Sequence, residues 1–259
     1  MKNKQIEGQL TLDFCFNTEN YVVQSNDLIA AKQALSLNSA KIFRAAVMQI
    51  KPDDNEFGYY KVSIRELSEL LHVSASNLYR DVSKIEEELS TGVAVFKKYT
   101  KNKIRDIRVP LTSICDYESS VGLKIELNPK LKPYLLNLKR QYTQIPDNDY
   151  NLFTSVYALR IYELLMSKIT LKVLPMEGTY IEIPINEIKE ATSTEHYSRA
   201  ADFKRKVLDI SVKNINTHTM FRVSYTRLKK RSGKYDTVRF FINMVYHPDC
   251  YLPKEDKVG

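Results

Sequence analysis

The chain has 259 residues, of which 43% are hydrophobic and 27% charged, a composition typical of a globular protein that excludes a largely disordered one. The formal net charge of +8 is concentrated: residues 199–239 hold twelve Lys or Arg against three Asp, a net charge of +9, so the rest of the chain sums to −1. A local basic surface of this kind favours a phosphate-rich partner such as nucleic acid.

Nothing in the sequence indicates a secreted or membrane protein. Residues 1–9 lack the apolar run and the small-residue cleavage site of a secretory signal, and no eighteen apolar residues follow one another. The cysteines Cys15, Cys115 and Cys250 stand too far apart for a CxxC motif, and their odd number is unlike a disulfide framework. We therefore expect a cytoplasmic protein with reduced thiols, no metal or other cofactor and no membrane partner.

An internal repeat predicts two domains with the same plan. Residues Lys41–Ile50 and Arg160–Ile169 match in their apolar positions at a helical period, so each is expected to form the first helix of a domain. Between the copies lie a predicted strand, a short helix and the turn-rich residues 144–149, where we place the domain boundary. The predicted divisions are an N-terminal segment 1–20, a first domain 21–146, a second domain 147–247 and a C-terminal tail 248–259.

In the first copy, a capping box marks a helix start. Ser63 and Glu66 have the S-x-x-E spacing in which each side chain accepts a hydrogen bond from the other residue's backbone N–H. The predicted elements are a strand 59–62, a short helix from Ser63, a polar turn 72–76, a longer helix 76–89, strands 93–99 and 104–109 around a basic turn, and a strand 122–127. The helix residues expected in the core are Leu67, Leu70, Leu71, Leu78, Val82, Ile85 and Leu89.

The second copy repeats this order. Pro184 suits the first turn of a short helix because its missing N–H would be unpaired there. The predicted elements are a strand 180–183, a short helix 184–188, a polar turn 191–196, a longer helix 198–216, and strands 221–225 and 237–242 around a long basic turn 229–234. The helix residues expected in the core are Ile185, Ile188, Phe203, Val207, Ile210 and Ile215.

A helix, a tight turn and a second helix, followed by a hairpin, form a winged helix, whose second helix normally enters the major groove of DNA. We therefore predict an α+β fold with two tandem winged-helix domains. In the second domain the candidate DNA-binding residues are Ser198, Arg199, Asp202, Arg205 and Lys206 on the helix and Lys229, Lys230, Arg231 and Lys234 on the wing. In the first domain they are Ser76, Asn77, Tyr79, Arg80, Lys84, Lys101 and Lys103.

The two predicted surfaces differ in charge and in role. An arginine can bond guanine O6 and N7 with two donors, so Arg199 and Arg205 are the expected base readers. The wing lysines are expected to bind backbone phosphate. An alternative for Arg205 is a surface ion pair with Asp202, and for the wing a merely soluble loop. Acidic residues beside the first helix predict weaker contacts there.

Several motifs, taken together and in order, resemble the iteron-binding plasmid replication initiators, the family that includes the F-plasmid initiator. The resemblance runs from about Val23 to Val245. Its motifs are Ser25-Asn-Asp-Leu28, Leu127-Asn-Pro-Lys-Leu-Lys-Pro-Tyr-Leu-Leu-Asn-Leu-Lys139, Tyr142-Thr-Gln144, Ser155-Val-Tyr-Ala-Leu-Arg-Ile-Tyr-Glu-Leu-Leu165, Phe203-Lys-Arg-Lys-Val-Leu208 and Asn214-Ile-Asn216.

The resemblance implies a bacterial protein that binds direct repeats in double-stranded origin DNA as a monomer. It further implies that dimers form through the first domain and repress the initiator's own promoter, and that host replication proteins such as a helicase or initiator are recruited. In such proteins the second domain makes the stronger contact, through basic residues that match Arg199, Arg205 and Lys206.

Other functions remain open at this point. A rolling-circle initiator would need a His-x-His metal pair, but the four histidines are separate, and no G-x-x-x-x-G-K-S/T phosphate loop supports a helicase-type initiator. We therefore predict that the chain is not an enzyme. A transcriptional repressor without a replication role fits tandem winged helices equally well, and a basic membrane-surface protein would bind anionic vesicles without preferring any DNA sequence.

Overall fold

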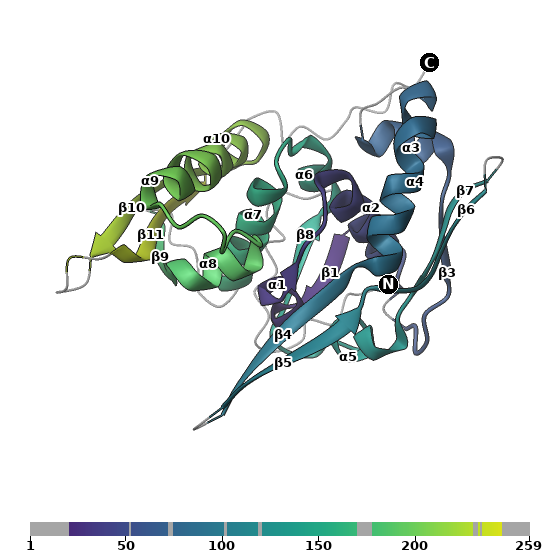
Figure 1. Ribbon diagram of the computed structural model, residues 1–259, viewed down its shortest axis with the longest axis horizontal. Coiled ribbons are helices and arrows are strands. Elements are labelled where there is room, and N and C mark those ends of the chain that lie inside the picture. Colours follow the sequence, from purple (N-terminus) through teal and green to yellow (C-terminus); the bar gives the residue numbers. More distant parts are fainter. Residues whose placement is uncertain are drawn as a thin grey trace, which may run out of the picture.

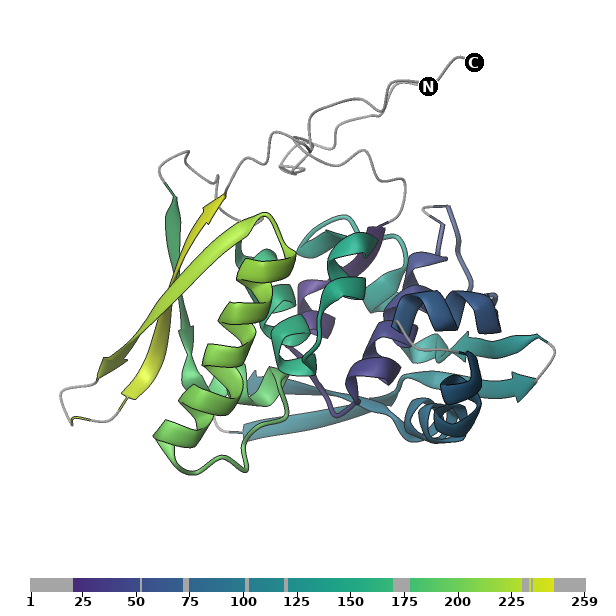
Figure 2. The same ribbon diagram turned by 90° about the horizontal axis from the view of Figure 1, so that it is seen from above.

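In a computed structural model, a three-stranded sheet lies at each end of the molecule, and most of the helices lie between them together with the other sheets (Figure 1). The view from above shows the same arrangement, with the sheet of the second winged helix at one end and a sheet of the first at the other (Figure 2). The structure describes residues 21–51, 53–71, 75–100, 103–118, 121–169, 178–229, 233 and 235–244.

The first winged helix follows the predicted order. Glu66 accepts a hydrogen bond from the Ser63 N–H at 2.7 Å, and Ser63 Oγ accepts one from the Glu66 N–H at 3.2 Å, which confirms the capping box. Its helices and strands are α2 (Leu37–Met48), β3 (Tyr59–Val62), α3 (Ile64–Leu71), α4 (Ala75–Thr91), β4 (Val93–Thr100), β5 (Lys103–Pro110), β6 (Thr112–Glu118) and β7 (Gly122–Leu127). Leu67, Leu71, Val82, Ile85 and Leu89 are buried, as the helical spacing predicts.

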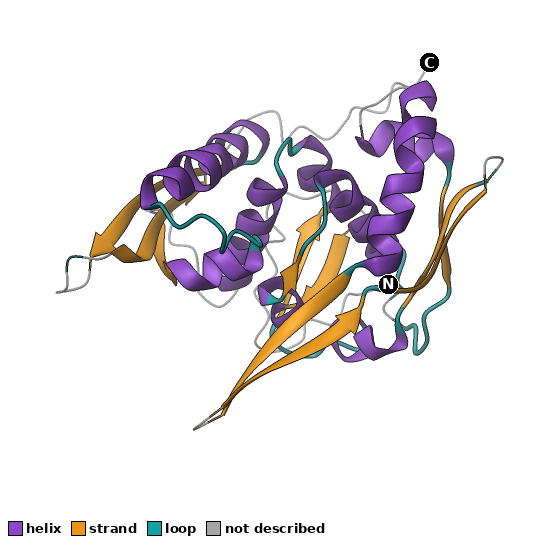
Figure 3. Ribbon diagram, viewed as in Figure 1, coloured by secondary structure: helices purple, strands orange, loops and turns teal. Residues whose placement is uncertain are grey.

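Short elements precede and follow these. At the start, Ser25 Oγ accepts a hydrogen bond from the Leu28 N–H and caps a helix. The elements are β1 (Tyr21–Ser25), α1 (Asn26–Ala30), β2 (Lys32–Gln33), η1 (Pro129–Leu131), α5 (Lys132–Leu135), β8 (Tyr142–Pro146) and α6 (Asp147–Leu152). Within the described residues the sheets are antiparallel, with strand orders β1-β8, β2-β4-β5 and β3-β7-β6 (Figure 3). A further sheet has the strand order Phe221–Lys229, Tyr235–Met244, Thr179–Pro184.

Residues 144–149 are not the turn that we predicted. Gln144, Ile145 and Pro146 belong to β8, which pairs with β1 from Tyr21–Ser25, and α6 starts directly afterwards. The polar residues of β8 are held by pairing with a distant part of the chain, which the local sequence does not show. Thr143, for example, is buried, and its hydroxyl donates a hydrogen bond to Asn26. The domain boundary after residue 146 stays a prediction.

The second winged helix also follows the predicted order. Its elements are α7 (Val156–Ile169), β9 (Thr179–Pro184), α8 (Ile185–Ala191), α9 (Ala200–Phe203), η2 (Lys204–Leu208), α10 (Asp209–His218), β10 (Phe221–Lys229) and β11 (Tyr235–Met244). Pro184 ends β9 and occupies the cap position, one residue before the first helical turn. Ile188 is buried and Ile185 half-buried against the core.

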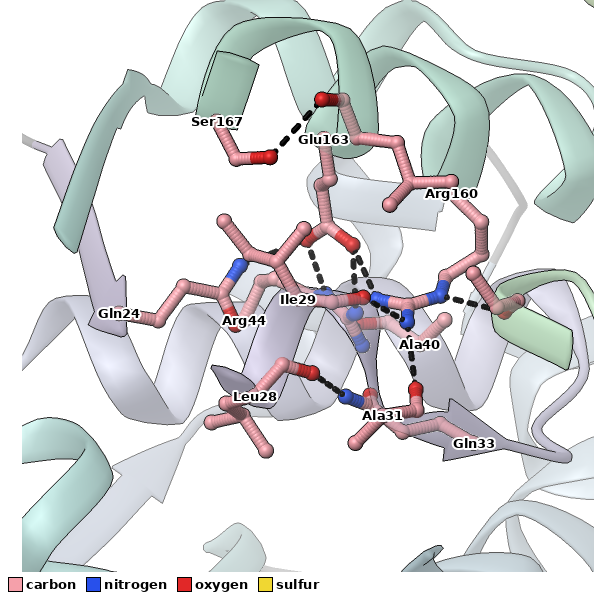
Figure 4. A network of polar contacts seen from close by, with 12 residues as sticks. Gln24, Leu28, Ile29, Ala31, Gln33, Ala40, Arg44, Arg160, Glu163 and Ser167 are labelled. Carbon is pink, nitrogen blue, oxygen red and sulfur yellow. Dashed lines mark hydrogen bonds and ion pairs between the residues drawn. The ribbon is translucent and has the colours of Figure 1, made fainter. Parts of the chain in front are cut away.

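A buried charge network joins the two winged helices (Figure 4). Glu163 on α7 accepts two hydrogen bonds from Arg44 on α2, each at 3.0 Å. It also accepts one from Gln24 at 2.7 Å and one from Arg160. Burial opposes the ionisation of Glu163, but the two guanidinium groups outweigh it and keep the pKa of this carboxyl below its usual value. Glu163 is therefore a buried carboxylate that holds α2 and α7 together.

Arg160 extends this joint to the backbone. Its guanidinium donates hydrogen bonds to the carbonyl oxygens of Ile29 and Ala31 at 2.6 and 2.8 Å, and to that of Ala191, at the end of α8, at 3.0 Å. The Arg160 side chain thus satisfies carbonyl groups at the end of α1 and at the end of α8. It therefore fixes α7 against an element of each winged-helix half.

Candidate nucleic-acid interface

The second recognition helix is composed of α9, η2 and α10, one continuous helix from Ala200 to His218. Two asparagines fix it. Asn214 Oδ1 accepts hydrogen bonds from the N–H and the hydroxyl of Thr154, before α7. The Asn216 side chain donates a hydrogen bond to the carbonyl oxygen of Val223 on β10 and accepts one from the Val223 N–H. Asn214 and Asn216 therefore position the helix against its neighbours.

The basic residues of this helix point outward. Arg199, at the N-cap, and Arg205 and Lys206 are all exposed, with 74% of the Arg205 side chain accessible. Arg205 lies 3.4 Å from Asp202, an exposed pair of a kind that contributes little stability. The Lys206 ammonium lies 5.4 Å from the centre of the Tyr197 ring, in the turn before the helix, where Ser198 is also exposed. This face is free to meet a polyanion.

A turn of π-helix, η2, interrupts the helix, and the Asp209 N–H bonds the Lys204 carbonyl oxygen five residues earlier. Such a turn adds one residue and rotates everything after it by about 100°. The prediction that Ile210 is buried was therefore wrong: Ile210 is 41% exposed, while Leu208 and Ser211 are buried. Phe203, Val207 and Ile215 are buried, as predicted.

One polar group beside this turn is unsatisfied. Ser211 Oγ is buried with no hydrogen-bond partner, and an unsatisfied hydroxyl costs about 1–3 kcal/mol. Ser211 lies four residues after Val207 and four before Ile215, on the same buried stripe of the helix. Lys204 and Asp209 bridge the π turn at 2.8 Å, and Tyr225 on β10 donates a 2.5 Å hydrogen bond to Asp209.

At the base of the wing, two cations flank one aromatic ring. The Arg227 guanidinium lies 4.3 Å and the Lys229 ammonium 5.0 Å from the centre of the Tyr235 ring. Arg227 also donates a hydrogen bond to the carbonyl oxygen of Ala200, at the start of the recognition helix. This cluster connects the helix with the wing. Lys230, Arg231 and Lys234 lie outside the described residues.

The first recognition helix, α4, carries fewer free cations. Arg80 and Lys84 are exposed, but Arg80 lies 3.3 Å from Asp81. Ser76, Asn77 and Tyr79 lie in the first turns of α4, Lys103 is the first residue of β5, and Lys101 lies outside the described residues.

One acidic residue of α4 has a structural task. Glu88 accepts hydrogen bonds from the Ser36 N–H at 3.0 Å and the Ser39 hydroxyl at 2.7 Å, at the start of α2. Burial opposes the ionisation of Glu88, yet the hydrogen bonds from Ser36 and Ser39 lower its pKa. Part of the acidity of α4 therefore caps another helix.

The structure thus brings Ser198, Arg199, Asp202, Arg205 and Lys206 together on one helix end, with Lys229 on the adjoining hairpin. Sequence reasoning missed Arg227, Tyr235 and Tyr197. Arg227 lies within the basic run 199–239 and two residues before Lys229 on the same strand. Because side chains two apart on a strand share a face, the alternation of the predicted strand is the signal that would have pointed to Arg227.

Across the described ranges, no three His, Cys, Asp or Glu side chains are grouped as a metal site, and no helix is both long and apolar enough to span a membrane. Cys115 is a free thiol, and burial raises its pKa to about 12.

Family models match the chain in two places. The model described as "Initiator Replication protein, WH1" matches residues 21–166, and that described as "Initiator Rep protein, WH2" matches residues 182–242. The two descriptions agree with the structure in giving two winged helices. The first match extends through α6 and most of α7, the helix described above as the first of the second winged helix.

Relatives and a solved structure extend this match. A "Replication initiation protein" of Escherichia coli is 22% identical over 253 residues, covering 92% of this chain and 74% of the relative. An "Uncharacterized 27.6 kDa protein" of Escherichia coli is 25% identical over 230 residues, covering 83% and 92%. The Pi initiator protein, in a crystal structure with iteron DNA, has the same fold, with a TM-score of 0.67, 17% identity and coverage of 88% and 99%.

Proposed function

The chain belongs to the family of replication initiator proteins with two winged-helix domains, and we propose that it initiates plasmid replication by binding directly repeated origin sequences, the iterons, as a monomer. The observation that carries this proposal is the exposed basic helix end with Arg199, Arg205 and Lys206, continuous through Arg227 with a basic wing. The Pi initiator, which has the same fold, is bound to iteron DNA.

In this role the second winged helix, proposed as residues 147–247, supplies the main specific contact. Arg199 and Arg205 read guanine edges, while Lys206 and the wing residues Lys229, Lys230, Arg231 and Lys234 bind phosphates. Ser198 and Asp202 lie at the same helix end. The first winged helix, proposed as residues 21–146, adds a weaker contact through Ser76, Asn77, Tyr79, Arg80, Lys84, Lys101 and Lys103.

The proposed mechanism is mechanical and asks for no catalysis or cofactor from the chain. Monomers bind successive repeats in the bacterial cytoplasm, bend the origin, help to open an adjacent A·T-rich segment and recruit host replication proteins such as a helicase or initiator. Dimers made through the first domain repress the initiator's own promoter. Opening and recruitment rest on family membership, whereas the basic surface supports the DNA-binding step.

Footprinting and a replication assay test the proposal together. Two winged helices on one face of DNA should protect two major grooves about 10 base pairs apart within a repeat of roughly two turns. Protection of a single groove would contradict tandem binding. A plasmid carrying the gene and its flanking repeats should replicate, whereas tight repeat binding without replication would identify a repressor instead.

A further inference from the structure

We propose that Ile210 recognises the methyl group of a thymine in the bound repeat, so that the π turn η2 creates a sequence-reading position. This inference rests on the proposed function. It starts from the finding that, directly after the π turn, Ile210 is 41% exposed while the Ser211 hydroxyl is buried without a partner.

Both placements are unfavourable in the free protein. A branched apolar side chain meets water, and a hydroxyl loses its hydrogen bonds. Local violations of this kind concentrate at functional sites. Because π turns are also frequent at functional sites, η2 fits this pattern. A partner with an apolar group to offer would remove Ile210 from water.

The neighbours of Ile210 identify that partner. Four exposed residues follow one another at spacings of four, three and four, which places them along one stripe of the helix: Lys206, Ile210, Lys213 and Thr217. Ile210 is thus an apolar residue between two cations on a recognition helix. A protein interface would call for neighbouring apolar residues, whereas a DNA groove offers phosphates for the lysines and one isolated apolar group.

That group is the C5 methyl of thymine, the apolar feature of the major-groove edge of the base pairs. An isoleucine side chain between phosphate-binding lysines has the right chemistry to cover it. The contact would add discrimination of thymine from cytosine to the guanine recognition assigned to Arg199 and Arg205.

The test removes the methyl group from the DNA and the side chain from the protein. The probe is a duplex carrying the repeat that the full-length chain selects from a random-sequence library, with each thymine replaced in turn by deoxyuridine. For the wild type, one replacement should weaken binding about fourfold, which corresponds to ~0.8 kcal/mol for one buried methyl group. The variant I210S should bind the unmodified duplex about fourfold more weakly and should be insensitive to that same replacement.

Two variants serve as controls. K213A lies on the same stripe and should weaken all duplexes equally while keeping the sensitivity to deoxyuridine. S211A removes the unpartnered hydroxyl and should leave DNA binding unchanged. In urea, I210S should unfold at the wild-type midpoint because Ile210 is exposed. A large loss of stability in I210S would show that Ile210 is buried in solution and would overturn the proposal.

The remaining outcomes separate this inference from the function on which it rests. Selection of no sequence from the library would refute the proposed function and the inference with it. Selection of a repeat whose binding ignores every deoxyuridine would refute the inference alone. The same holds if I210S keeps the full sensitivity of the wild type.

Discussion

The two recognition helices occupy equivalent places in the two winged helices, but they differ in charge and in continuity. α4 is a regular helix of 17 residues in which Arg80 meets Asp81 and Glu88 caps α2. The second helix is interrupted by η2, and Arg199, Arg205 and Lys206 are exposed on it. The regular helix has Arg80 and Glu88 engaged within the fold, whereas the interrupted helix carries exposed basic residues.

This contrast holds only if the two winged helices stay joined, and Glu163 is the residue that tests the joint. E163Q keeps the shape of the side chain but leaves Arg44 and Arg160 buried without a counter-charge. We expect urea denaturation to show a loss of about 3–5 kcal/mol in the free energy of unfolding. E69Q, which breaks the exposed pair with Arg65, should leave the midpoint unchanged. A stable E163Q would mean that the charge network does not hold the joint.

Two arginine variants test whether the two winged helices contribute unequally to DNA binding. R205A should cost about 1–3 kcal/mol of binding free energy and relax the preference at one base pair, because a bidentate guanine contact is lost. R80A, on the equivalent helix of the first domain, should cost less because the acidic residues Asp81, Glu86 and Glu87 of α4 reduce the positive potential around Arg80. Fluorescence anisotropy with singly substituted duplexes measures both effects. A larger loss for R80A would reverse the proposed ranking of the two domains.

The wing should add affinity without adding sequence preference. K229A removes one cation from the base of the wing, so it should weaken all duplexes alike and reduce the slope of log affinity against log salt by about one. Titrations at several salt concentrations measure the slope. A loss confined to a single sequence would show that Lys229 reads bases.

The smallest expected effect comes from the acidic side of α4. Glu87 is exposed, and E87Q removes one negative charge from the first recognition helix. Affinity for DNA should rise by less than about threefold at low salt and return to the wild-type value at high salt, because exposed charges are screened. An increase that persists at high salt would require a cause other than electrostatics.

Regular elements were predictable because local rules specify them. The helical spacing of Leu67, Val82 and Leu89 and the capping box at Ser63 act within a few residues, and the structure agrees with them. The pairing of β8 with β1 was not predictable in this way, because its partners stand more than a hundred residues apart. Long-range pairing does not appear in local periodicity.

The candidate interface also has a part that local sequence rules predict and a part that they do not. Its basic residues were predicted from the local charge and from their place on the outer face of the predicted helix, and the structure places Arg199, Arg205 and Lys206 on the surface. The position of Ile210 could not be found, since a 3.6-residue period assumes that no residue is inserted into the helix. The extra residue in η2 leaves no mark in the hydrophobic pattern of the sequence, so only the structure shows that Ile210 is exposed and Ser211 buried.

The joint between α2 and α7 also bears on how such a chain can arise by duplication. When the repeat aligns Lys41 with Arg160, it aligns Arg44 with Glu163, so the two ends of the buried ion pair occupy the same position of the two copies. Two identical subunits related by a twofold axis would meet there with equal charges, which repel each other. Fusion into one polypeptide lets the two copies diverge in sequence. Opposite charges at equivalent positions are therefore possible in a fused pair, whereas a homodimer of identical subunits cannot have them.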